Sequence, residues 1–308
     1  MTAPGPVWMN GALVEWADAT LHVTTQTVLG GLNAYEVIPG YLASPGDRLL
    51  LLRLDDHLAR LADSAKIMRL TSELSRDDLR NAVLHVASRR RVAGDVLIRL
   101  VLYLEDGPLF SYEAGDIRTG CFAFVTEAPV GPRDGAGLAL GTTAWTRLSD
   151  SSAPPRVKAG SNYQNARLAQ MQARVNGYDD ALLINAAGMI SELPLANFFI
   201  VKDGILRTPN VTSDILEGIT RRTVLELASE MGIETDEREI DRSEAYVADE
   251  AFLTGSSRDV WPVASVDRYP IGDGRSGAIT NRLRERLAQV VRGVGGHLEW
   301  LTEVSRDQ

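Results

Sequence analysis

The chain has 308 residues, of which 44% are hydrophobic and 24% are charged, and it carries a formal net charge of -9 at pH 7. This is the composition of an ordinary globular protein, and the length favours two domains over one. The negative charge argues against a nucleic-acid partner, because binding to a phosphate backbone needs clustered cations. No stretch approaches the roughly 20 apolar residues of a membrane span, and the first residues lack a secretion-signal pattern, so neither insertion nor secretion is expected.

The single cysteine, Cys121, excludes a disulfide within the chain. It lies in the apolar run at residues 121–125, where a buried and unreactive thiol is expected. Because a chain without disulfides suits a reducing compartment, we expect the protein to be cytoplasmic.

The first half of the chain alternates strand-like and helix-like patterns. Leu58, Leu61 and Ala65 recur at helical spacing and predict a helix that begins at Asp55. The apolar run at residues 96–104 is short and rich in strand formers, which predicts a buried strand. The elements expected in this half are strands around 7–14, 35–41 and 49–54, helices from 55 and over 76–90, and strands over 96–104 and 121–126.

Proline and glycine interrupt the pattern at residues 129–141, where we expect a linker between an N-terminal domain (1–128) and a C-terminal domain (142–308). In the second half, Asp203-Gly204 is typical of a hairpin turn, and Gly177 and Gly232 are typical helix ends. The expected elements are helices over 161–176, 220–231 and 277–292, and strands over 181–185, 197–201 and 251–254.

The chain contains only three lysines, at positions 66, 158 and 202. Lys66 and Lys202 stand in settings typical of solvated side chains. Lys158 follows two prolines and precedes small residues that lead into a helix, whose positive end disfavours the ammonium form; a neutral amine can attack an aldehyde. The local sequence by itself still favours a solvated lysine.

Residues 157–163 read Val-Lys-Ala-Gly-Ser-Asn-Tyr, which resembles the Lys-Ala-Gly-Gly-Asn-Tyr segment of class IV aminotransferases, the fold-type IV pyridoxal-phosphate enzymes. Other segments of that family are matched in the same order along nearly the whole chain. Residues 54–67 and 157–163 are closest to branched-chain amino acid aminotransferases, whereas Tyr35-Glu36-Val37 is closer to D-amino acid aminotransferases. The matching segments are residues 54–67, 190–199, 216–221 and 248–256.

The resemblance implies a two-domain α/β (α+β) fold of fold type IV, with a smaller N-terminal α/β domain and a larger C-terminal α/β pseudo-barrel domain. It implies pyridoxal 5'-phosphate as cofactor and transfer of an amino group between an amino acid, branched-chain or otherwise apolar, and a 2-oxo acid. It also implies a homodimer or higher homo-oligomer, and no metal.

The resemblance further implies a role for each matching residue. Lys158 would be the catalytic residue, holding the cofactor as a Schiff base and carrying a proton to and from the substrate. Glu192 would pair with the pyridine nitrogen, and Tyr163 would bind the phenolic oxygen. The residues implied at the cofactor phosphate are Arg60, Gly218, Ile219, Thr220 and Ser256, and those implied at the substrate are Tyr35, Arg99 and Ser257.

Several of these residues also have ordinary structural interpretations. Arg60, judged from the sequence alone, lies on a solvated helix face, and Thr220 could be only a helix N-cap. Glu192 could be a solvated turn residue, although its apolar neighbours argue against exposure. Arg99 is the only charge in the apolar run and therefore needs an anionic partner, which is either a carboxylate such as Asp95 or Glu105 or that of the substrate.

The chain departs from the family pattern at Leu193-Pro194-Leu195, which replaces a Gly/Ala-rich stretch and puts bulk near the expected cofactor position. Other class IV activities therefore stay open: D-amino acid aminotransferase, amine transaminase or aminodeoxychorismate-type lyase. A further alternative is a cofactor-free α/β protein that binds another phosphate ligand at the helix start near Gly218.

Overall fold

The computed structural model describes residues 5–43, 48–108, 118–129 and 136–306. Its two sheets and flanking helices confirm the mixed α/β class. The chain divides into a first unit (residues 1–128, 157–161 and 289–308) and a second unit (129–156 and 162–288). The segment that carries Lys158 thus belongs to the first unit. Of the expected linker, residues 130–135 lie outside the described residues, and a strand begins at Leu138.

The first unit is built on a seven-stranded sheet with the order β16-β4-β3-β5-β6-β1-β2, in which every pairing is antiparallel. The last strand, near the C-terminus, pairs with β4 and so returns the chain end to this unit. The strands are β1 (Val7–Met9), β2 (Ala12–Val14), β3 (Asn33–Leu42), β4 (Leu49–Leu52), β5 (Val96–Asp106), β6 (Arg118–Glu127) and β16 (Leu301–Val304).

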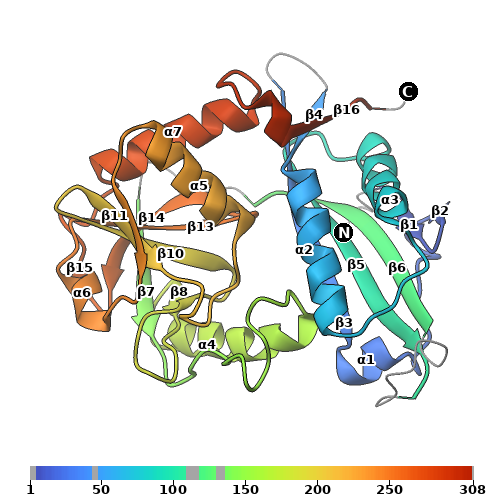
Figure 1. Ribbon diagram of the computed structural model, residues 1–308, viewed down its shortest axis with the longest axis horizontal. Helices are drawn as coiled ribbons and strands as arrows, with labels where there is room; N and C mark the ends of the chain where they lie inside the picture. The colour runs from blue at the N-terminus through green and yellow to red at the C-terminus, as the bar shows by residue number, and fades with distance from the viewer. Residues whose placement is uncertain (1–4, 44–47, 109–117, 130–135, 307–308) are drawn as a thin grey trace. The chain divides into compact units, whose positions relative to one another are not determined.

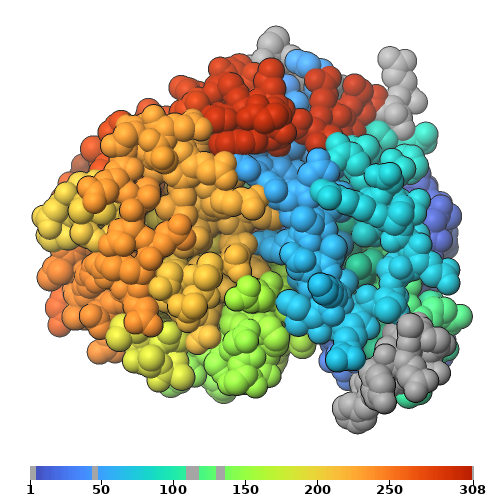
Figure 2. All heavy atoms as spheres, viewed as in Figure 1, coloured from blue at the N-terminus to red at the C-terminus, as the bar shows by residue number. Residues whose placement is uncertain are grey.

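Two helices, α2 (Leu54–Ile67) and α3 (Arg76–Ser88), pack on one face of this sheet. Figure 1 shows them in blue and cyan, and their atoms cover that face in Figure 2. Helix α3 begins with a capping box between Ser75 and Asp78, which satisfies two backbone N–H groups that a helix start leaves unpaired. The apolar stripe of each helix forms the core with alternate residues of β3, β5 and β6. A short helix α1 (Gln26–Gly30) precedes β3.

The second unit contains a nine-stranded sheet whose main order is β12-β11-β10-β13-β14-β7-β8. The pairings β11–β12, β14–β7 and β7–β8 are parallel, and the remaining ones are antiparallel. The strands are β7 (Leu138–Thr142), β8 (Asp180–Leu182), β9 (Glu192–Leu193), β10 (Ala196–Lys202), β11 (Ile205–Pro209), β12 (Thr235–Arg238), β13 (Glu250–Gly255), β14 (Asp259–Val266) and β15 (Tyr269–Pro270).

The expected hairpin turn at Asp203-Gly204 is confirmed, since both residues have positive φ (53° and 76°) and join the antiparallel strands β10 and β11. The helices are α4 (Tyr163–Val175), α5 (Ile219–Glu230), α6 (Arg242–Tyr246) and α7 (Ala278–Val291), with a 3-10 turn at Gly160–Asn162 before α4 and another at Leu298–Trp300 before β16. None of the described helices combines the length and the apolar composition that a membrane-spanning helix needs.

Candidate functional site

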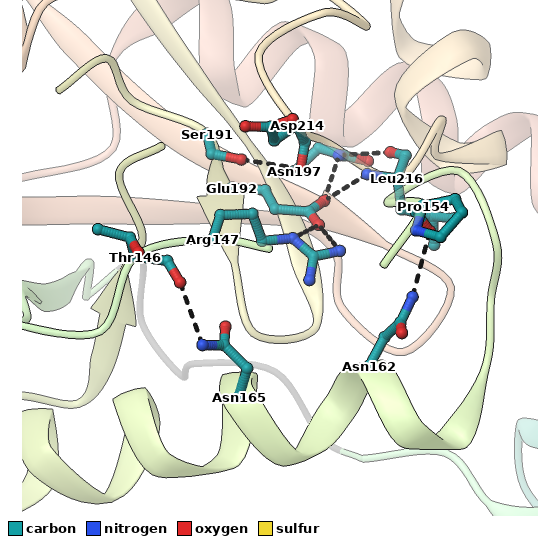
Figure 3. A network of polar contacts seen from close by, with 10 residues as sticks. All are labelled: Thr146, Arg147, Pro154, Asn162, Asn165, Ser191, Glu192, Asn197, Asp214 and Leu216. Carbon is teal, nitrogen blue, oxygen red and sulfur yellow. Dashed lines mark hydrogen bonds and ion pairs between the residues drawn. The ribbon is translucent and has the colours of Figure 1, made fainter. Parts of the chain in front are cut away.

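The carboxylate of Glu192 is the centre of a buried polar network in the second unit (Figure 3). Its Oε1 accepts a hydrogen bond from Nε of Arg147 at 2.9 Å, and a second guanidinium nitrogen lies 2.8 Å away. Its Oε2 accepts from Nδ2 of Asn197 at 3.0 Å and from the backbone N–H of Leu216 at 3.1 Å. The side chains of Glu192 and Arg147 are each only 8% exposed. The interpretation of Glu192 as a solvated turn residue is therefore wrong.

The β9–β10 hairpin explains how this carboxylate is positioned. Glu192 and Asn197 are paired in register and share one face of the sheet, while Leu193 and Ala196 share the other. Leu193 is 1% exposed and packs in the hydrophobic core, so its bulk fills the core, whereas Leu195, at the turn, is 49% exposed. Of the bulk expected near the cofactor position, the Leu193 side chain therefore lies in the core, which leaves Pro194 and Leu195 at the turn.

Helix α5 begins at Ile219, shortly after Leu216, and its N-cap makes no side-chain hydrogen bond. Its N-cap is Gly218, so the interpretation of Thr220 as the N-cap is wrong; Thr220 lies buried in the first turn. The first N–H groups of a helix lack partners within the helix and carry a partial positive charge, which suits an anion. Beside them, Oγ1 of Thr254 is buried without a hydrogen-bond partner among the described residues, and Thr254 is paired in register with Asn197.

Replacing Gly218 with alanine is expected to lower the free energy of unfolding by about 1–3 kcal/mol. The added Cβ would lie 2.0 Å from Oδ1 of Asn197, whose amide is held by Glu192 and by the carbonyl of Leu216. Urea unfolding measures the effect. Gly94→Ala is the matched control, since its Cβ would meet nothing within 4 Å. Equal stability of the two variants would contradict this account.

In the first unit, backbone hydrogen bonds anchor the segment that carries Lys158 to β3. The N–H of Tyr35 donates to the carbonyl of Lys158 at 2.9 Å, and the N–H of Gly160 donates to Oδ1 of Asn33 at 3.1 Å. The N–H of Lys158 itself donates to Oγ of Ser64, on α2, at 3.2 Å. Its Nζ lies 5.1 Å from the ring centroid of Tyr35. The structure thus brings together two of the expected site residues, Lys158 and Tyr35.

A second buried network in this unit joins β3 to α2. Glu36, which is fully buried, accepts two hydrogen bonds at 2.8 Å from the guanidinium of Arg60 and one at 2.7 Å from Nδ1 of His57. Since a carboxylate only accepts, Nδ1 of His57 is the donor. The Arg60 side chain is only 13% exposed, so its interpretation as a solvated side chain is wrong. Its orientation is fixed by a carboxylate beneath it.

The pKa values of this network predict acid destabilisation. Burial by itself would raise the pKa of Glu36, but the charge of Arg60 and the hydrogen bonds from Arg60 and His57 lower it to about 2. Burial lowers the pKa of His57, and its hydrogen bond with Glu36 opposes that shift. The unfolded chain therefore binds protons, first at His57 and then at Glu36, at pH values where the folded chain does not.

We expect the free energy of unfolding to fall as the pH drops below about 6.5, with on the order of 3 kcal/mol from Glu36 lost between pH 5 and pH 2. Glu36→Gln should be less stable than the wild type at pH 7, because it leaves Arg60 without its anion, and the gap should narrow in acid. Urea unfolding across pH measures both curves. A gap that stays constant from pH 7 to pH 3 would contradict the assignment.

Arg99 does not occupy the buried position that the sequence predicted. It is exposed, and the two structural partners considered for it pair elsewhere: Asp95 with Arg292 at 2.5 Å, and Glu105 with Arg118 at 3.1 Å. The reason is strand alternation, because Arg99 points to the face of the sheet opposite α2 and α3. It is paired in register with Val37 and so lies on the same face as Tyr35.

The other expected site residues lie in the second unit. Ser256 and Ser257 form the turn between β13 and β14 and are partly buried. Tyr163 is the first residue of α4 and is also partly buried. The prediction for Cys121 is confirmed, since it is buried and burial raises the pKa of its thiol to about 12.

Comparison with known proteins shows which family the chain belongs to. The family model for class IV aminotransferases matches residues 34–266, more than half of the chain. The chain belongs to the class IV aminotransferase family. This class IV aminotransferase is 34% identical over 302 residues to a branched-chain-amino-acid aminotransferase of Pseudomonas aeruginosa, with 97% of each chain covered.

Solved structures of relatives resemble this class IV aminotransferase closely. A branched-chain amino acid aminotransferase of Thermobaculum terrenum (the M3 mutant) has a TM-score of 0.93 at 37% identity and covers 99% of both chains. The same organism's enzyme in its PLP form has a TM-score of 0.92 at 36% identity, covering 99% of this chain and 100% of the other. The fold-type IV architecture expected from the motifs is thereby confirmed.

Sequence reasoning missed three residues that this class IV aminotransferase uses to build the two networks: Arg147, Glu36 and His57. Each joins a partner that is distant in the sequence, such as Arg147 and Glu192, 45 residues apart. The one sequence signal for Arg147 was that it is a charged residue shortly before the Lys158 segment. The residues next to it in the sequence did not predict that it pairs with a buried carboxylate.

Proposed function

We propose that the chain is a pyridoxal-phosphate-dependent aminotransferase that moves the amino group between a branched-chain or other apolar L-amino acid and a 2-oxo acid. The observation that carries the proposal is the buried carboxylate of Glu192, fixed by Arg147 and Asn197 next to the uncapped start of α5. A fixed carboxylate suits a protonated pyridine nitrogen, and a helix start suits a phosphate. The relatives named above are branched-chain aminotransferases, and their names support the substrate class.

The residues present fit the cofactor. Pyridoxal phosphate, when bound, supplies an aldehyde for amines and an electron-withdrawing ring that stabilises negative charge at the substrate α-carbon. Among the described residues the buried hydroxyl of Thr254 has no hydrogen-bond partner, so it is a further polar group near Glu192 that can hydrogen-bond a ligand. Glu192 would hold the ring nitrogen, and Tyr163 would donate to the phenolic oxygen.

Each remaining residue binds, orients or moves a proton. Lys158 would hold the cofactor through its side-chain amine, and that amine would remove the proton from the substrate α-carbon and later return a proton. The N–H groups of residues 218–220, Arg60 and Ser256 would hold the phosphate. Tyr35, Arg99 and Ser257 contact the substrate, and the exposed guanidinium of Arg99 suits a carboxylate.

We also propose that the enzyme assembles as a homodimer or higher homo-oligomer in the cytoplasm. The lone, buried Cys121 is consistent with a reducing compartment. Size-exclusion chromatography with light scattering tests the assembly, and a monomer at enzyme-assay concentrations would contradict it.

A donor screen tests the proposed reaction. Protein supplied with pyridoxal phosphate is incubated with 2-oxoglutarate and with L-valine, L-leucine, L-isoleucine, their D-enantiomers or simple chiral amines. We expect kcat/KM for the L-branched donors to exceed that for the D-forms by at least about 100-fold. Faster reaction of D-amino acids or amines would overturn the substrate assignment. Pyruvate release from an aminodeoxychorismate-like substrate without any keto acceptor would overturn the transaminase assignment itself.

A further inference from the structure

A tight turn between β13 and β14 carries Ser256 and Ser257. The N–H of Arg258 donates to the carbonyl of Gly255 at 2.9 Å, so the two serines occupy the central positions of a β-turn. A Cβ on Gly255 would lie 2.8 Å from the carbonyl oxygen of Leu195. Only glycine lets the base of this turn pack directly against the backbone of the β9–β10 turn.

Arg258, the residue after the serines, is tied to two other elements of the second unit. Its guanidinium lies 2.6 Å from Oδ2 of Asp180, at the start of β8. Oδ1 of Asp180 accepts from Nε2 of Gln170 on α4 at 3.1 Å and from the N–H of Ala181 at 2.9 Å. The guanidinium also lies 5.5 Å from the ring centroid of Trp261, on β14. Both oxygens of the carboxylate are thus engaged.

The pair is buried, since the side chains of Arg258 and Asp180 are 12% and 2% exposed. Buried ion pairs stabilise a fold little better than apolar side chains of similar size, because both charges lose their hydration. Ion pairs are more directional than apolar contacts, because a guanidinium and a carboxylate bind each other in only a few geometries. The main effect of this pair is therefore on the position of the turn, and its effect on the stability of the fold is small.

We propose that the Arg258–Asp180 ion pair is a positioning contact that fixes the Ser256–Ser257 turn for ligand binding. The inference rests on the proposed function, in which Ser256 binds the cofactor phosphate and Ser257 the substrate. Arg258 and Asp180 act through the turn and touch neither ligand. Because small displacements of binding groups cost large factors in affinity, a loosened turn binds both ligands more weakly while the lysine chemistry is unaffected.

The decisive variant is the double substitution Asp180→Asn with Arg258→Met. It removes both charges, so no buried charge is left unpaired, and the asparagine oxygen still accepts from Gln170 and Ala181. We expect the thermal midpoint to stay close to that of the wild type. The dissociation constant of pyridoxal phosphate and the KM of the amino donor should each rise about tenfold, with kcat at saturation within about twofold.

Hydrogen exchange of the ligand-free chain gives a readout that does not depend on activity. Amide exchange in a peptide spanning residues 255–258 should be about tenfold faster in the double variant, since the N–H of Arg258 closes the turn. Arg258→Lys, which keeps the positive charge but loses the planar guanidinium, should fall between the wild type and the double variant in every constant.

Lys202→Met is the matched control. It removes the exposed ion pair between Lys202 and Asp249, which lies at the end of β13 away from the serine turn. Little effect on ligand binding or amide exchange is expected there. A double variant with wild-type cofactor and donor constants and unchanged exchange would overturn the proposal. A wild-type chain that neither binds pyridoxal phosphate nor transaminates would instead contradict the proposed function, while the exchange measurement would still test whether the pair fixes the turn.

Discussion

Replacing Lys158 with alanine is expected to lower the rate of transamination by at least about 10⁴-fold and to abolish the visible absorption of the bound cofactor. The amine is both the attachment point and the proton carrier in the proposed reaction. Steady-state assays and absorption spectra measure the two effects. Small primary amines added to the variant should restore part of the rate, because they supply the missing proton acceptor.

The chain offers two matched controls for this prediction, because it has only two other lysines. Lys66 is exposed on α2, and Lys202 pairs with Asp249 at the surface. Alanine at either position should leave the absorption band and the rate within about twofold, as is usual for surface substitutions. If Lys158→Ala kept a tenth of the wild-type rate, or if either control lost the band, the assignment of the lysine would be wrong.

Replacing Glu192 with glutamine is expected to lower kcat by about 10²–10³-fold, because the ring nitrogen would lose its anionic partner. It should also lower the free energy of unfolding by about 3–5 kcal/mol, because Arg147 would stay buried opposite a neutral amide. The two effects have different causes and can be separated. Enzyme kinetics measures the first, and urea unfolding measures the second.

The double variant Arg147→Met with Glu192→Gln separates them. It leaves no buried unpaired charge, so most of the lost stability should return. The rate should stay low, because the carboxylate is still missing. Recovery of the rate together with stability would show that Glu192 has only a structural role, and a single variant as active as the wild type would contradict the proposed contact with the ring nitrogen.

Local sequence patterns predicted the elements whose signals are local. Helices α2, α3 and α5 have apolar stripes at helical spacing, and β5 and β6 are runs of strand formers. Elements defined by distant pairing were missed. β16 forms a strand by pairing with β4, about 250 residues earlier in the chain. β7 overlaps the expected linker, and it was missed because its partner β14 comes much later in the chain.

The residues of the candidate site also fall into those with a local sequence signal and those defined by distant partners. Lys158, Glu192 and residues 218–220 were found because their neighbours match family motifs. The side chains that orient Arg60 and Glu192 were not found, because Glu36 lies 24 residues from Arg60 and Arg147 lies 45 residues from Glu192. Arg99 was placed wrongly because an apolar run predicts a strand without telling which of its residues faces solvent.

The measurement that tests the central claim most directly is chemical trapping of the cofactor. The wild-type protein is saturated with pyridoxal phosphate, reduced with borohydride and digested, and the modified peptide is located by mass spectrometry. The proposed function predicts one stoichiometric phosphopyridoxyl group, on Lys158, with Lys66 and Lys202 unmodified. Absence of a Schiff-base absorption band together with an unmodified Lys158 would contradict it.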